Sequence, residues 1–93
     1  MRTIDRSSAF KRDYKREAKG RHRDKLDAVL KPVLVALASD EPLESRCHDH
    51  DLSGDWSGYR ECHIKPDLLL IYRKADADNL KLARLGSHSQ LFG

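Results

Sequence analysis

The feature that most constrains the fold of this chain is a continuous apolar run at residues 68–72, LLLIY. A run without polar interruption is typical of a central strand, which is buried on both faces. Two weaker strand patterns, at residues 59–64 and 79–85, flank it and are separated from it by short turn segments. Because consecutive strands with short connections pair antiparallel, the sequence predicts a small antiparallel sheet.

Two helices are predicted before the sheet. The first covers residues 8–19, has a narrow apolar stripe and ends at Gly20, a typical C-terminal cap. The second covers residues 22–39, where apolar residues follow the helical period. Pro32 lies inside it and predicts a kink or break. The short connection predicts an antiparallel helical hairpin.

The order of these elements predicts an α+β fold over residues 1–93, with a single domain as expected for this length. A small twisted antiparallel sheet would carry the N-terminal helical hairpin on one face and leave the other face free for function. Residues 1–5 give a weak strand signal, and residues 43–56 are predicted to form a loop. The segment SHSQLF near the C-terminus is predicted to be a short helix or a tail.

Composition and motifs exclude several classes of function. No apolar run is long enough to span a membrane, and the N-terminus lacks the apolar region of a signal peptide, so we expect a cytoplasmic protein. Cys47, His48, His50, Cys62 and His63 are metal-ligand types but lack the paired spacings of zinc modules. We therefore expect no metal and no cofactor.

Positive charge is concentrated at the N-terminus, where residues 1–25 hold ten Lys or Arg and four Asp or Glu. Such a region indicates a polyanionic partner, an acidic protein partner or a solvated helix face. The candidate RNA- or ribosome-binding residues are Lys11, Arg12, Lys15, Arg16, Lys19, Arg21 and Arg23.

Three residues near the predicted strands point to chemistry. His63 and Asp67 flank a tight turn and are expected to lie opposite each other, where the carboxylate would orient the imidazole. Arg84 would share the buried face of its strand with Leu80 and Leu82 if the strand alternates regularly. Burying an unpaired Arg is costly, so either a bulge turns it outward or the strand end emerges beside a groove.

These side chains fit RNA cleavage by attack of the 2′-hydroxyl. Histidines suit the base that takes the 2′-hydroxyl proton and the acid that protonates the leaving 5′-oxygen, and the candidates are His50, His63 and His88. Arg84 would stabilise the charge on the phosphate, and Phe92 or Trp56 would hold an unstacked base. His48 is two residues from His50 and is expected to face away from it.

The run DHDLSGDWSGYRECHIKPDLLLIYR and the ending LARLGSHSQLFG resemble the YafQ branch of the RelE/ParE toxin superfamily. The resemblance implies a toxin of a type II toxin–antitoxin pair that cuts mRNA codons in the ribosomal A site without a metal. It places Arg84 on the phosphate, His88 as the acid, and His50 or His63 as the base. The family's catalytic positions correspond here to His50, His63, Asp67, Arg84, His88 and Phe92.

The resemblance also implies partners. The basic helix would face 16S rRNA in the ribosome, and an antitoxin of the DinJ/RelB kind would silence the toxin with an acidic segment. Operator DNA would be bound only through the antitoxin complex. The alternatives are a ParE-like gyrase poison that cuts nothing, and an inactive toxin-fold binding module.

Overall fold

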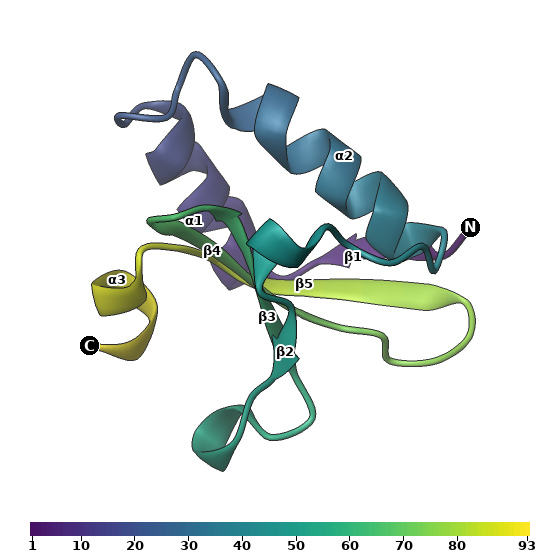
Figure 1. Cartoon of the computed structure of the whole chain (residues 1–93). Helices are drawn as coiled ribbons and strands as arrows, with labels where there is room; N and C mark the ends of the chain where they lie inside the picture. The colour runs from purple at the N-terminus through teal and green to yellow at the C-terminus, as the bar shows by residue number, and fades with distance from the viewer.

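The computed structural model describes residues 1–93 and contains one five-stranded sheet and three helices (Figure 1). This arrangement confirms the predicted α+β class. No helix is both long enough and apolar enough to cross a membrane. Two 3₁₀ turns, η1 (Ser45–Cys47) and η2 (Gly54–Trp56), flank the short strand β2. The regular elements are β1 (Thr3–Arg6), α1 (Ser8–Ala18), α2 (Leu26–Ala38), β2 (His50–Asp51), β3 (Arg60–Lys65), β4 (Leu68–Arg73), β5 (Asn79–Gly86) and α3 (His88–Phe92).

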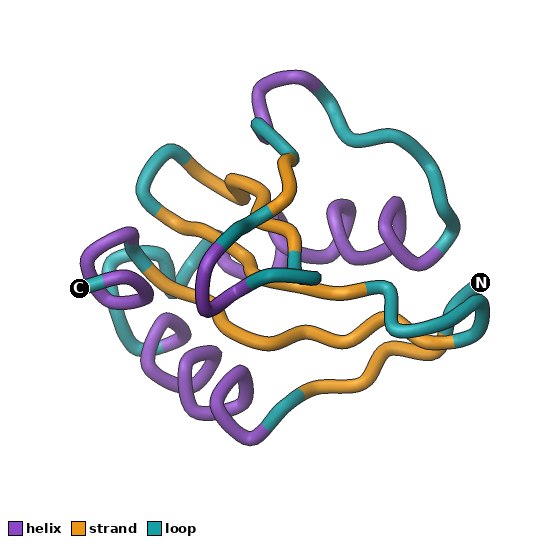
Figure 2. Tube along the Cα trace, turned by 90° about the horizontal axis from the view of Figure 1, so that it is seen from below, coloured by secondary structure: helices purple, strands orange, loops and turns teal.

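The strands lie in the order β1-β5-β4-β3-β2, so the apolar run in β4 is central as predicted (Figure 2). Strands β2 to β5 pair antiparallel, but β1 pairs with β5 in parallel, which makes the sheet mixed. The prediction of a wholly antiparallel sheet is therefore wrong at this edge. Antiparallel pairing is expected only of strands joined by short connections, and most of the chain separates β1 from β5.

Strand β1 covers only the first half of β5, and α1 covers the rest of that edge. β1 pairs with β5 as far as Leu82. Ser7 then donates its N–H to the Leu82 carbonyl at 3.0 Å and its hydroxyl to the Ala83 carbonyl at 2.8 Å. The same hydroxyl accepts the Phe10 N–H and so caps α1. α1 is thereby fixed beside the end of β5 that carries Arg84.

Helix α2 continues through Pro32 without a break, contrary to one of the two predicted outcomes. Pro32 itself is exposed. It removes only one backbone hydrogen bond, while Leu26, Leu30, Val33 and Leu37 of the same helix are all buried. Burial of four such side chains outweighs the loss of that bond.

Two apolar clusters hold the sheet. The larger comprises 14 buried residues and lies between the sheet and the helical hairpin. The smaller lies on the opposite face, where Leu69, Ile71 and Ala83 pack with Leu91 of α3. The sequence had suggested that this face is free for function. It is partly covered instead, because β4 is apolar on both sides. The open part is a strip along β2, β3 and the end of β5.

Candidate active site

One row of paired residues crosses the open strip from β2 to β5. His50 pairs with Glu61, Glu61 with Ile71, and Ile71 with Arg84. Neighbouring strands lie about 4.8 Å apart, so the backbones of His50 and Arg84 are separated by roughly 14 Å. His50, Glu61 and Arg84 therefore lie on one face of the sheet, with the fully buried Ile71 between Glu61 and Arg84.

A bulge in β5 sets the direction of Arg84. Tyr72 pairs with Leu82 and Ile71 pairs with Arg84, so Ala83 is an extra residue in β5. The bulge shifts the alternation by one residue and puts Arg84 on the face opposite Leu82. This confirms one of the two outcomes that the sequence left open.

Arg84 is held by a buried carboxylate on α1. Its Nε and Nη2 donate to Asp13 at 2.7 and 3.2 Å, and Asp13 is only 3% exposed. Burial alone would raise the pKa of Asp13. The hydrogen bonds from Arg84 and the Leu85 N–H, together with the charges of Arg84 and Arg16, bring that pKa below its ordinary value. Hydrogen bonding to Asp13 likewise raises the pKa of Arg84, whose Nη1 makes no hydrogen bond within the protein.

Glu61 lies between two of the predicted catalytic histidines. Its Oε1 is 3.8 Å from Nε2 of His50 and 3.5 Å from Nε2 of His63, and the residue is only 5% exposed. One carboxylate therefore lies within reach of both imidazole rings. Glu61 was not predicted as a site residue, although its position two residues before His63 in a strand puts both on one face.

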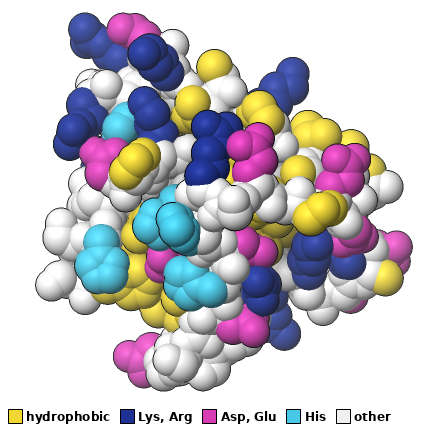
Figure 3. All heavy atoms as spheres, in the orientation of Figure 1, with side chains coloured by type: hydrophobic (Ala, Val, Ile, Leu, Met, Phe, Trp, Pro, Cys, Tyr) yellow, Lys and Arg dark blue, Asp and Glu magenta, His cyan; other side chains and the backbone are white.

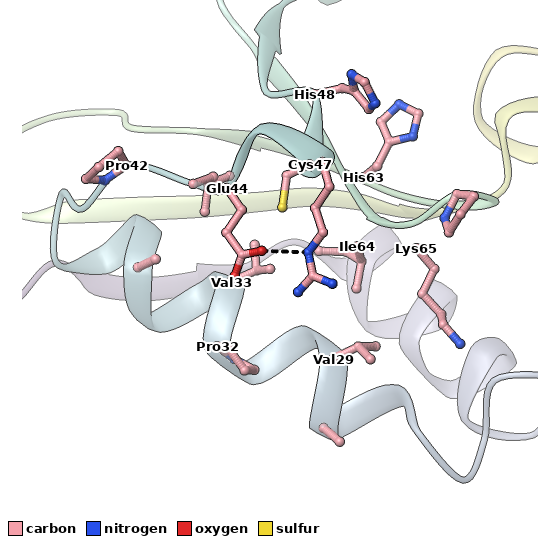
Figure 4. Close-up of a pocket in the computed structure, with 15 residues that line it drawn as sticks. Val29, Pro32, Val33, Pro42, Glu44, Cys47, His48, His63, Ile64 and Lys65 are labelled. Atoms are coloured by element: carbon pink, nitrogen blue, oxygen red, sulfur yellow. Dashed lines mark ion pairs between the residues drawn. The ribbon is translucent and has the colours of Figure 1, made fainter.

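His48 is a neighbour of the site and does not face away from it. Its backbone is left-handed, with φ of 48°, and its carbonyl oxygen lies 2.6 Å from Nδ1 of His50. Its ring meets the ring of His63 edge-on, with centroids 5.4 Å apart (Figure 4). The prediction was wrong because residues two apart in an extended segment share a face, and a left-handed residue at the end of η1 also turns the chain here.

Asp67 does not contact His63. Its carboxylate lies 3.0 Å from Arg21 and 3.5 Å from His22 in the α1–α2 connection. Lys65 pairs with Leu68, so the turn is shorter than expected and Leu69 takes the position opposite His63. Asp67 therefore ties two loops together, and the predicted pair with His63 is wrong.

His88 and Phe92 are carried by α3. A capping box between Ser87 and Gln90 starts this helix, and buried Leu91 anchors it to the smaller apolar cluster. The ring centroids of His88 and Phe92 lie 5.0 Å apart. Phe92 is exposed, and His88 is the first residue after the capping residue Ser87. The pair thus sits at the surface, where a substrate can reach it.

Trp56 and the cysteines are placed for packing. Trp56 meets Tyr59 edge-on at 5.2 Å and packs on the smaller cluster. Cys47 and Cys62 are free thiols buried in the larger cluster, and burial raises the pKa of Cys62. No three His, Cys, Asp or Glu side chains form a group that could hold a metal ion.

The basic residues divide into free and engaged groups. Arg16 donates to Asp13, to Glu17 and to the Leu85 carbonyl, and Arg21 pairs with Asp67. Arg16 is thus engaged in the fold, and its predicted contact with RNA stays a prediction. Figure 3 shows Lys and Arg side chains next to the gathered histidines. Of the seven predicted RNA-binding residues, the exposed ones without an ion pair are Lys11, Arg12, Lys15, Lys19 and Arg23.

A groove of about 710 Å³ opens beside the site between α2 and the β3–β4 turn (Figure 4). Val29, Pro32 and Val33 form its α2 wall, and His48 and His63 lie at its rim. Glu44 and Arg46, which also line the groove, form an ion pair at 2.8 Å.

Comparison with known proteins gives consistent matches over the whole chain. The family described as "Bacterial toxin of type II toxin-antitoxin system, YafQ" matches residues 2–93. The mRNA interferase toxin YafQ of Escherichia coli K12 is 39% identical over 94 residues, covering 100% of this chain and 98% of the relative. YafQ in the E. coli DinJ–YafQ complex superposes with a TM-score of 0.85 at 37% identity, with both chains fully covered. A copper-bound mutant toxin from Helicobacter pylori gives 0.83 at 42% identity, covering 99% of this chain and 100% of that one.

Proposed function

Because this chain belongs to the YafQ family of bacterial type II toxins, we propose that it is an endoribonuclease that cuts mRNA codons in the ribosomal A site. Cleavage there would stop translation. The observation that carries this proposal is the placement of Glu61 between His50 and His63, on the same strip as Arg84. A gyrase poison has no use for such an acid–base pair.

His50 is the proposed general base. A carbonyl oxygen can only accept, so the 2.6 Å contact with His48 requires the proton on Nδ1 of His50. In the neutral ring Nε2 then carries a lone pair that can take the proton of the 2′-hydroxyl. Glu61 stabilises the imidazolium that forms, and His63 shares this carboxylate.

The remaining roles follow from charge and exposure. The 2′-oxygen attacks phosphorus, the bond to the 5′-oxygen breaks, and His88 donates a proton to that leaving oxygen. Arg84 stabilises the negative charge on the phosphate through its free Nη1, and Phe92 packs against a base. Products are a 2′,3′-cyclic phosphate and a 5′-hydroxyl. Asp67 holds the α1–α2 connection beside the site.

This chemistry needs no metal in the proposed mechanism, because imidazoles supply both proton transfers. The likeness to a copper-bound toxin makes metal independence a matter for direct test. We expect the same cleavage rate with and without EDTA. Loss of cleavage on chelation, restored by one added metal, would overturn this part of the proposal.

The partners proposed are the ribosome, its mRNA and an antitoxin. The exposed basic residues of α1 would contact rRNA, so ribosome binding should weaken steeply as salt rises. The relative solved with DinJ supports a cognate antitoxin, with an acidic segment suited to this surface. Such a protein would act in the cytoplasm.

The test is to add the purified protein to a translating extract and map new mRNA 5′ ends by primer extension. We expect ends within codons, and their loss with His50→Ala and His88→Ala. Ser89→Ala, the next residue along α3, is the matched control and should cut normally. Absence of new ends, or equal cutting by all variants, would refute the nuclease assignment.

A further inference from the structure

His48 has an unusual backbone, and its neighbours fix it there. It is one of two non-glycine residues with positive φ, at 48°, and it terminates η1. Cys47, directly before it, is buried in the larger apolar cluster. A left-handed conformation costs about 1 kcal/mol or more for most residues, so it persists only where the surroundings determine it. The direction of the His48 carbonyl is therefore set by the fold.

That carbonyl determines the tautomer of His50. It lies 2.6 Å from Nδ1, and because it can only accept, the proton of the neutral ring is on Nδ1. The lone pair is then on Nε2, which lies on the Glu61 side of the ring. Without this contact the Glu61 carboxylate, 3.8 Å from Nε2, would favour a proton on Nε2 instead, since His50 has no other hydrogen bond.

The side chain of His48 contacts the second histidine of the site. Its ring lies edge-on to His63, with centroids 5.4 Å apart and planes inclined by 66°. His63 in turn lies 3.5 Å from Glu61 through Nε2. One residue outside the catalytic set therefore touches both imidazoles that share Glu61, one with its backbone and the other with its ring.

We propose that His48 is a positioning residue, whose left-handed backbone selects the Nδ1–H tautomer of His50 and whose ring restrains His63. This inference rests on the proposed nuclease function for its kinetic consequence, but the tautomer itself is a property of the folded protein. The two roles are separable, because one belongs to the backbone and the other to the side chain.

Two substitutions separate them. Asn tolerates the left-handed conformation, so His48→Asn keeps the carbonyl direction and removes the ring. Val disfavours that conformation, so His48→Val turns the carbonyl away as well. Asp40→Val is the matched control: Asp40 also has positive φ, 58°, but lies at the end of α2 and does not contact the histidines.

The experiment measures the imidazole ¹⁵N shifts of labelled protein by long-range ¹H–¹⁵N correlation, with His50 assigned from the His50→Gln variant. We expect the Nδ1–H tautomer in the wild type, in His48→Asn and in Asp40→Val, and its loss in His48→Val. An Nε2–H tautomer of His50 in the wild type would overturn the proposal, even if no variant were folded well enough to compare. So would an unchanged tautomer in folded His48→Val.

Single-turnover cleavage of ribosome-bound mRNA gives the second readout. His48→Val should lower the cleavage rate constant by about tenfold or more, a part of the 10²–10⁴-fold that a positioned base contributes, with little change in RNA affinity. His48→Asn should lose much less. Equal rates for His48→Val and Asp40→Val would overturn the positioning role. If the wild type cuts nothing while His50 shows the Nδ1–H tautomer, the nuclease proposal fails and the structural inference stands.

Discussion

Replacing Asp13 by Asn should destabilise the protein and misdirect Arg84 at the same time. Asp13 accepts hydrogen bonds from Nε and Nη2 of Arg84, from Nη1 of Arg16 and from the Leu85 N–H. Asn keeps one oxygen for the Leu85 N–H, but its NH₂ group then faces two guanidinium groups. The substitution therefore leaves two cations without their shared carboxylate.

The expected loss follows from the burial of the three side chains. Removing one partner of a fully buried ion pair costs about 3–5 kcal/mol. Arg84 and Arg16 have side chains 28% and 40% exposed, so both can regain water. We therefore expect a loss of about 2–3 kcal/mol, which in a domain of this size lowers Tm by roughly 10–20 °C.

Urea unfolding followed by the fluorescence of Trp56, the single Trp, measures this loss. Glu17→Gln is the control, because Glu17 contacts Arg16 but not Arg84. The folded-state pKa of Asp13 is below its ordinary value of 3.8, so its stabilisation is present above about pH 4 and is lost as pH falls through the lowered pKa. The difference between wild type and Asp13→Asn should therefore shrink in acid. A difference below about 0.5 kcal/mol at pH 7, or one that does not shrink, would refute this account of Asp13.

Three further predictions concern the site and the core. Gly86→Ala builds a Cβ 2.7 Å from Nη2 of Arg16. The free energy of unfolding in urea should therefore fall by about 1–3 kcal/mol, and the cleavage rate should fall too. Wild-type values for both would contradict this account of Gly86. Glu61→Gln should lower the single-turnover cleavage rate by about 10–100-fold, as expected for loss of a charged contact of about 1.5–3 kcal/mol. The urea midpoint should change little. An unchanged rate would exclude Glu61 from the mechanism. Burial and then the hydrogen bond to Asp49 raise the pKa of Tyr72, so its stabilisation is complete below about pH 10 and is lost as pH rises through the raised pKa. Tyr72→Phe should therefore flatten the loss of stability in alkali, measured by urea unfolding from pH 8 to 11, and an unchanged slope would contradict that assignment.

The elements that the sequence predicted best are those whose pattern depends on burial alone. The run at residues 68–72 indicated β4, because a strand in a two-sided core must be apolar on both faces. The flanking alternation indicated β3 and β5. The direction of β1 was not predictable, because no short connection constrains it. The bulge at Ala83 was one of two alternatives, and only the pairing of Ile71 with Arg84 decides between them.

The site residues were predicted as types, and their contacts were not. Glu61 was missed and Asp67 was assigned the wrong partner because each depends on strand register, which a shift of one residue changes completely. His48 was misplaced because residues two apart in an extended segment share a face, whereas the prediction put His48 and His50 on opposite faces. Strand register therefore limits prediction of this site more than residue chemistry does.

Helix α1 connects the proposed RNA-binding surface to the proposed catalytic cation. Its exposed face carries Lys11 and Lys15, while its buried face presents Asp13, which holds Arg84 through two hydrogen bonds. Those two faces belong to one short, capped helix fixed to the edge of β5. RNA bound on the Lys side therefore cannot shift α1 without moving the carboxylate that directs Arg84. Substitutions that weaken RNA binding by removing a Lys should leave Arg84 in place, whereas those that displace α1 from β5 should reduce binding and catalysis together.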